Sequence, residues 1–213
     1  MNSKQILNIL FAGVVFLASF PAGAQLSAAA QSASAAAVPV FDVGGTLFEM
    51  SANVAGANLI LNGASDSTML SARATAVGMY LTDRRNTPEA AMALKGAKRM
   101  RLVALRDIQS KDLASVLLDR IRNNSTPEET ISNMSQIGAL GRIFGTRAKL
   151  LKGDVVTIDW IPQGQNTVFK INDQEIGNPI PGEGFYPLMM KVWLGPKVRE
   201  TTRNNLLGIG VAK

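Results

Sequence analysis

The fold of this chain is decided by Gly184-Phe185-Tyr186-Pro187-Leu188-Met189-Met190-Lys191-Val192-Trp193-Leu194-Gly195-Pro196 and by the Leu206-Leu207-Gly208 that follows. Apolar side chains recur here at intervals of three and four residues, which predicts a helix with a buried stripe. Gly195-Pro196 should end that helix, because Gly adopts the capping conformation and Pro cannot continue a helix. We expect a second short helix before Leu206.

Upstream of this stretch, strands and helices alternate in blocks. Thr87 and Thr126 are predicted N-caps, each followed by Pro at the first helical position, and Glu129 completes a capping box with Thr126. Ser110 is predicted to cap the helix between them. Strands are predicted at residues 40–43, 46–50, 57–61, 72–82, 98–106, 155–161 and 167–171, with a break at Asn62-Gly63. The helix after Thr126 should bury a stripe of Ile131, Met134, Ile137, Leu140 and Phe144.

Blocks of strands followed by blocks of helices are typical of an α+β fold rather than a parallel α/β sheet. We therefore expect helices on one face of an antiparallel sheet. An apolar cleft is expected between the strand at residues 72–82 and the helices at residues 114–121 and 185–193.

The beginning of the chain predicts export. Lys4 precedes an apolar run at residues 6–20, and Ala22-Gly23-Ala24 has the small residues of a cleavage site. Residues 1–24 are therefore interpreted as a signal peptide to the periplasm, with a retained membrane anchor as the alternative. Residues 25–38 are rich in Ala and Ser and should form a flexible lead, with a frayed helix as the alternative. Residues 39–213 should form one domain.

Composition excludes several kinds of chemistry. The chain has no Cys and no His, which removes thiolate and imidazole catalysis and the usual transition-metal ligands. Its net charge is +6, from scattered basic residues without an aromatic-basic binding motif. We therefore expect no metal, no cofactor and no nucleic-acid partner, while contact with an anionic membrane surface stays open.

Several short motifs occur in the order of one known family and span residues 40–207. They are Leu61-Asn62-Gly63-Ala64, Ala76-Val77-Gly78-Met79-Tyr80-Leu81, Arg99-Met100-Arg101-Leu102, Arg106-Asp107-Ile108, Gly153-Asp154, Asn172, Ile176-Gly177 and the tail quoted above. The chain resembles the chalcone isomerase-like proteins, in particular their exported bacterial branch. The resemblance implies an open-faced β-sandwich, in which helices layer on one face of an antiparallel sheet and a cleft binds flat aromatic or fatty-acid ligands.

The plant isomerases of this family add a phenol to an enone within one chalcone molecule, without a cofactor. The resemblance implies an Arg, a Thr, a Tyr and an Asn that hold the ligand and stabilise charge on its carbonyl oxygen. Counted without gaps, the Arg position falls on Ser67 and the Thr position on Thr75. The Tyr position falls near Asp112 or Leu113, and the Asn position within residues 117–120.

Strand parity predicts that Arg73, Thr75, Val77 and Met79 share one face. If the family's reaction is kept, the resemblance implies that Thr75 and a repositioned Arg73 are the catalytic pair. Predicted ligand-binding residues are Ser67, Thr75, Val77, Met79, Leu113, Leu117, Tyr186, Met189 and Met190. Because the Arg and Tyr are not kept, the first hypothesis is a non-catalytic protein that binds a small apolar or fatty-acid-like ligand. The alternatives are a cofactor-independent isomerase, or an envelope interaction module whose cleft is filled by its own side chains.

Overall fold

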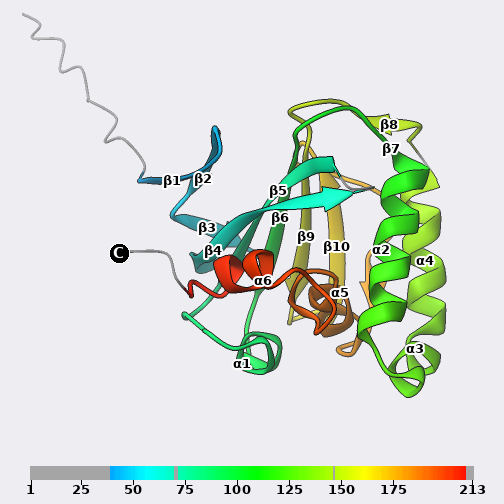
Figure 1. Cartoon of the computed structure of the whole chain (residues 1–213). Helices are drawn as coiled ribbons and strands as arrows, with labels where there is room; N and C mark the ends of the chain where they lie inside the picture. The colour runs from blue at the N-terminus through cyan, green and yellow to red at the C-terminus, as the bar shows by residue number, and fades with distance from the viewer. Residues whose placement is uncertain (1–38, 70–71, 146, 210–213) are drawn as a thin grey trace, which may run out of the picture. The chain divides into compact units, whose positions relative to one another are not determined.

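The computed structural model describes residues 39–69, 72–145 and 147–209 (Figure 1). The predicted signal peptide and the Ala/Ser-rich lead lie outside the described residues, so export stays a prediction. Within the described residues, no helix is long and apolar enough to cross a membrane.

One antiparallel sheet forms the centre of the domain. Its strands are β3 (Ser51–Val54), β4 (Ala57–Met69), β5 (Ala72–Leu81), β6 (Lys98–Ala104), β9 (Val155–Ile161), β10 (Asn166–Ile171), β11 (Gln174–Glu175) and β12 (Ile180–Pro181). They are ordered β11-β10-β9-β6-β5-β4-β3, and β12 also pairs with β10. Two small sheets stand apart, β1 (Val40–Val43) with β2 (Thr46–Glu49), and β7 (Ile108–Gln109) with β8 (Lys149–Leu150).

The helices supply the side chains that cover one face of this sheet. They are α1 (Pro88–Ala93), α2 (Ser110–Asn124), α3 (Pro127–Ser132), α4 (Met134–Gly145), α5 (Phe185–Leu194) and α6 (Glu200–Leu206). α2 and α4 lie side by side, and α5 packs against α2 (Figure 1). The main core lies between the helices and the sheet, and it contains Val77 and Met79 of β5 together with Met189 and Met190 of α5. The predicted α+β arrangement is confirmed.

The other face of the sheet carries a smaller core under the β1–β2 hairpin. Ala76 and Tyr80 of β5 lie on this face and pack with Phe48 and Leu61. From Ala76 onward, successive side chains of β5 therefore point to opposite faces of the sheet, as predicted.

Local capping signals give the correct helix starts at two places. Thr87 Oγ1 accepts from Ala90 N, and Thr126 forms the full capping box with Glu129. The Ser110 cap is wrong, because α2 already begins at Ser110 and its buried hydroxyl has no partner within the described residues.

The helix predicted after Thr126 is two helices. Asn133 ends α3 and its side chain donates to Glu129 O, so α4 starts anew at Met134. The first part of the predicted buried stripe is consequently exposed, with Ile131 at 66% and Met134 at 62% of their accessible surface, while Leu140 and Phe144 are buried.

The predicted break at Asn62-Gly63 is also wrong, because β4 runs through it with only a bulge. Asn62 Nδ2 donates to Leu206 O at 2.8 Å and to Arg85 O at 2.9 Å. At Gly63, a Cβ would lie 2.1 Å from Asn205 O, so only glycine lets the end of α6 come this close. The first and last family motifs therefore meet in space and lock α6 onto the sheet.

Gly63→Ala should lower the free energy of unfolding by about 2 kcal/mol, because the new methyl group must push α6 backbone away. Gly141→Ala in α4 is the matched control, since a Cβ there meets no atom within 4 Å. It should raise stability by up to about 1 kcal/mol through helix propensity. Urea denaturation of both variants measures the difference, and equal effects would contradict the close-approach argument.

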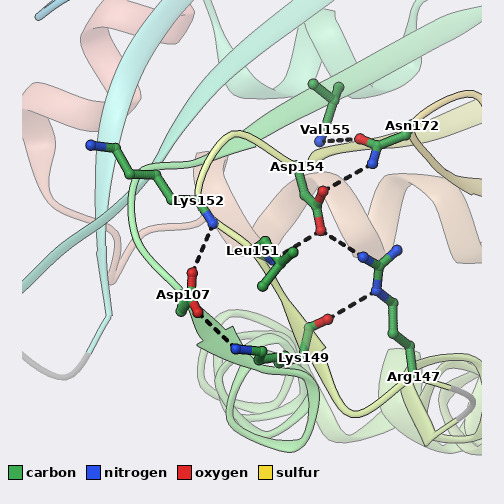
Figure 2. Close-up of polar contacts among 8 residues, drawn as sticks. All are labelled: Asp107, Arg147, Lys149, Leu151, Lys152, Asp154, Val155 and Asn172. Carbon is green, nitrogen blue, oxygen red and sulfur yellow. Dashed lines mark hydrogen bonds and ion pairs between the residues drawn. The ribbon is translucent and has the colours of Figure 1, made fainter.

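Two further residues of the family motifs, Asp154 and Asn172, lie where β9 begins and β10 ends (Figure 2). Asp154 accepts hydrogen bonds from Arg147 Nη2, Leu151 N and Asn172 Nδ2, each at 2.9 Å. The Asn172 side chain also accepts from Val155 N at 2.9 Å, and its bond to Asp154 lowers the pKa of that carboxyl. This cluster stabilises the turns that flank β9.

Asp107 completes the network from the β6–β7 connection (Figure 2). Its carboxylate accepts from Lys149 Nζ at 2.9 Å and from Lys152 N at 3.0 Å. Asp107, Asp154 and Asn172 are thus satisfied by chain-internal bonds that hold loops. Their presence in the family pattern is explained by folding rather than by ligand chemistry.

Candidate functional site

A polar hollow of about 110 Å³ lies where β4, α2 and the α5–α6 connection meet. Its lining residues are Ser67, Thr68, Arg120, Asn124, Lys197, Val198, Arg199 and Thr202. One predicted ligand-binding residue, Ser67, is therefore in the wall of this hollow.

Arg120 is the central side chain of the site. Its guanidinium donates to Ser67 Oγ at 3.1 Å and to Thr68 O, which holds it against β4. Burial lowers the pKa of Arg120, but an Arg starts so far above neutrality that it stays charged. Within the described residues, no carboxylate forms an ion pair with Arg120. A partly buried cation that no described carboxylate neutralises is therefore held at the hollow.

Arg120 lies beside the position at which the family resemblance implies an Arg and this chain has Ser67. The sequence places Ser67 at the family's Arg position, and the structure brings Arg120 from α2 to the Ser67 hydroxyl instead. Arg120 itself belongs to the range 117–120 in which the family's Asn position was expected. Its signal in the sequence was its place on the apolar face of α2, three residues after Leu117 and seven after Leu113.

The α5–α6 connection is fixed beside Arg120 by Asn124, which follows one helical turn later. Asn124 Nδ2 donates to Arg120 O at 2.9 Å, and Asn124 Oδ1 accepts from Lys197 N at 2.8 Å. At Gly195, a Cβ would lie 2.4 Å from Asn124 Cβ, so glycine permits this contact. Arg203 Nη1 donates to the carbonyls of Gly195 and Pro196 at 3.3 Å. The connection that carries Lys197 and Arg199 is thus tied to α2 and α6.

The predicted catalytic pair is separated by the sheet. Thr75 is 4% exposed and is paired with Ser67 in the strand register. Ser67 lines the hollow, whereas Thr75 does not. The register shifts between Ser67 and Thr68, so Arg73 leaves the face of Thr75. It pairs with Asp66 at 3.4 Å and donates to Val43 O at 3.2 Å, on the side of the β1–β2 hairpin. The predicted shared face is therefore wrong for Arg73.

The other predicted ligand-binding residues lie inside the main core. Val77, Met79, Leu113, Leu117, Met189 and Met190 are each at most 2% exposed. The Tyr186 hydroxyl donates to Ile158 O at 3.1 Å, and burial raises the pKa of Tyr186 well above its usual value. None of these residues lines the hollow at Arg120. Their side chains occupy the place of the predicted cleft, and their role in binding stays a prediction.

A second hollow of about 390 Å³ lies between α4 and the connection that leads into β12. It is lined by Ala139, Arg142, Ile143, Gly177, Asn178, Pro179, Ile180 and Pro181. Arg142 is its single charged side chain, so it lacks the gathered charge of the first hollow. Among the residues that the structure describes, no cluster of acidic side chains is suited to hold a metal ion.

A family model and a solved structure both match this chain and agree with the fold described above. The family model described as chalcone isomerase-like matches residues 40–208. No curated protein sequence matches the chain significantly. Among solved structures, a fatty-acid binding protein of Arabidopsis thaliana superimposes with a TM-score of 0.60 at 12% sequence identity, over 76% of this chain and 92% of that one. This likeness concerns the fold, while the family match covers most of the chain. The chain therefore belongs to the chalcone isomerase-like family.

Proposed function

We propose that this protein is a non-catalytic binder of a small fatty-acid-like ligand, whose anionic end is held by Arg120. The observation that carries the proposal is the Arg120 guanidinium, which lies at a hollow and has no carboxylate partner within the described residues. A guanidinium binds a carboxylate through two parallel hydrogen bonds, which suits this position. The similar Arabidopsis structure is named a fatty-acid binding protein, which supports the same class of ligand.

The apolar part of such a ligand needs space that the hollow does not offer. About 110 Å³ accommodates an anionic end group but not an acyl chain. The chain would have to enter the core by displacing side chains near β5 and α5. Met79, Met189 and Met190 lie there, and methionine side chains rearrange more readily than branched ones.

Calorimetric titration with laurate tests this proposal. Wild-type protein should bind laurate, and Arg120→Gln should weaken binding at least tenfold, because a hydrogen bond to a charged group contributes about 1.5–3 kcal/mol. Arg122→Gln is the matched control, since Arg122 lies on the same helix, 64% exposed, beside Asp119. It should bind laurate as the wild type does.

Three results would contradict the proposal. Absence of laurate binding by the wild type would favour a module whose core is simply filled. Equal affinities of the Arg120→Gln and wild-type proteins would place the ligand elsewhere. Closure of a chalcone faster than in buffer, at a rate that falls in Thr75→Val, would show that the protein is an isomerase.

A further inference from the structure

The hollow at Arg120 gathers more positive charge than one carboxylate needs. Arg120, Lys197 and Arg199 all line it, and no acidic residue does. The acids next to the lining residues along the chain have other partners. Asp66 pairs with Arg73 on the opposite face of the sheet, and Asp119 pairs with Arg122 on the surface of α2. Glu200 accepts a hydrogen bond from the Asn204 side chain. The described lining thus carries three positive charges and no negative one.

The backbone that carries these charges is fixed by the fold, and the Arg120 guanidinium is itself held against β4. Asn124 binds both the backbone of Arg120 and the amide of Lys197, and Gly195 lets the two segments approach. Val198 N donates to Gly195 O at 3.1 Å, which closes a tight turn that contains Lys197 and directly precedes Arg199. A site arranged before the ligand arrives loses less entropy on binding.

A neutral hydrogen-bond donor and the size of the hollow further restrict the kinds of ligand group that fit. Ser67 Oγ is buried and accepts from Arg120, which leaves its own proton available for an anion. The hollow has a volume of about 110 Å³, which suits a compact anionic group such as a tetrahedral oxyanion.

We infer that the hollow recognises the terminal phosphate of a phosphate monoester in preference to a carboxylate. The inference rests on the proposed function only in taking this hollow as the ligand site. A dianion with three terminal oxygens can engage Arg120, Lys197 and Arg199 together, whereas a carboxylate neutralises one of them. The phosphate could belong to a soluble monoester or to the headgroup of a membrane lipid, because Lys197 and Arg199 are both exposed at the rim.

Calorimetry with two ligands of equal chain length tests the inference. Dodecyl phosphate should bind the wild type at least tenfold more tightly than laurate. The double variant Lys197→Gln/Arg199→Gln should lose this preference while it still binds laurate through Arg120. The control is Lys111→Gln/Arg122→Gln, which removes two exposed charges from α2 outside the hollow and should keep the preference. Below about pH 6 the phosphate takes up its second proton, so the preference should shrink there.

The outcomes separate this inference from the proposed function. Laurate binding that equals or exceeds dodecyl phosphate binding would overturn the inference and leave the proposed function intact. A phosphate preference that survives in Lys197→Gln/Arg199→Gln would also overturn it. Binding of dodecyl phosphate without any binding of laurate would support the inference and contradict the proposed fatty-acid ligand.

Sedimentation with vesicles distinguishes the two sources of phosphate. Binding to phosphatidylcholine vesicles that contain phosphatidic acid, lost in the double variant, would support a lipid headgroup as the source. No vesicle binding, together with tight binding of dodecyl phosphate, would support a soluble monoester. Equal binding to vesicles with phosphatidylserine at matched surface charge would contradict recognition of a monoester.

Discussion

Asp159→Asn is expected to lower the free energy of unfolding by about 3 kcal/mol, because it leaves a charged guanidinium unpaired in the sheet. Asp159 on β9 accepts two hydrogen bonds of 2.6 Å from Arg99 on β6, its partner in the strand register. The Asp159 side chain is 3% exposed and that of Arg99 18%, so water replaces the lost contact poorly. The bond to Asp159 also raises the pKa of Arg99. Urea denaturation at neutral pH measures the loss.

Asp119→Asn is the matched control for this substitution. Asp119 and Arg122 form a surface pair on α2 at 3.7 Å, and both side chains are 64% exposed. Its loss should change stability by less than about 1 kcal/mol, because such pairs contribute little in water. The double variant Arg99→Met/Asp159→Leu should recover part of the stability lost in Asp159→Asn, since no unpaired charge remains. Equal losses for Asp159→Asn and Asp119→Asn would contradict this role of the buried pair.

What the sequence predicts correctly here is what neighbouring residues determine. The caps at Thr87 and Thr126 depend on atoms within three residues, and both form as predicted. The helix that ends at Gly195-Pro196 and the short helix that follows it are also confirmed. Repeated apolar spacing identifies the core face of β5 in the same way.

One failure arises where a distant segment decides the local structure. Asn62-Gly63 has the composition of a turn, but these residues lie within β4, and the end of α6 packs on them. That contact cannot be read from the residues nearby. The other failure is local, because apolar spacing continues from Ile131 to Met134 although α3 ends at Asn133, and both side chains are exposed.

The candidate site shows the same division. The sequence predicts Ser67 as a ligand-binding residue at the family's Arg position, and the structure places Ser67 in the wall of the hollow. It could not show that a helix 53 residues later supplies the guanidinium to the same hydroxyl. A usable signal did exist, because a charged residue on the apolar face of α2 requires a partner or a cavity. Arg73 was the replacement that the sequence favoured, but the bulge in β5 directs that side chain to the other face of the sheet.

Substitution of Lys98 should have the opposite effect and stabilise the protein. Lys98 is 5% exposed and lies on the core face of β6, paired in register with Leu81 and Trp160. Burial, with a smaller repulsion from Lys95, lowers the pKa of Lys98 from 10.5 to about 8. No carboxylate within the described residues compensates this amine. The folded protein therefore disfavours the charged form, and Lys98→Met should raise the free energy of unfolding by about 3 kcal/mol at pH 7.

The pH dependence of this gain follows from the two pKa values. Below about pH 8 the amine is charged in both states, so the full cost of burying it is present and the gain from Lys98→Met is largest. Between about pH 8 and 10.5 the unfolded chain keeps its proton while the folded protein loses it, so wild-type stability rises relative to the variant. The gain should nearly vanish above that range. Lys111→Met, on the exposed side of α2, should show neither the gain nor its pH dependence. Urea denaturation at a series of pH values compares the three proteins, and a gain that does not change with pH would mean that packing, not the buried charge, sets the cost of Lys98.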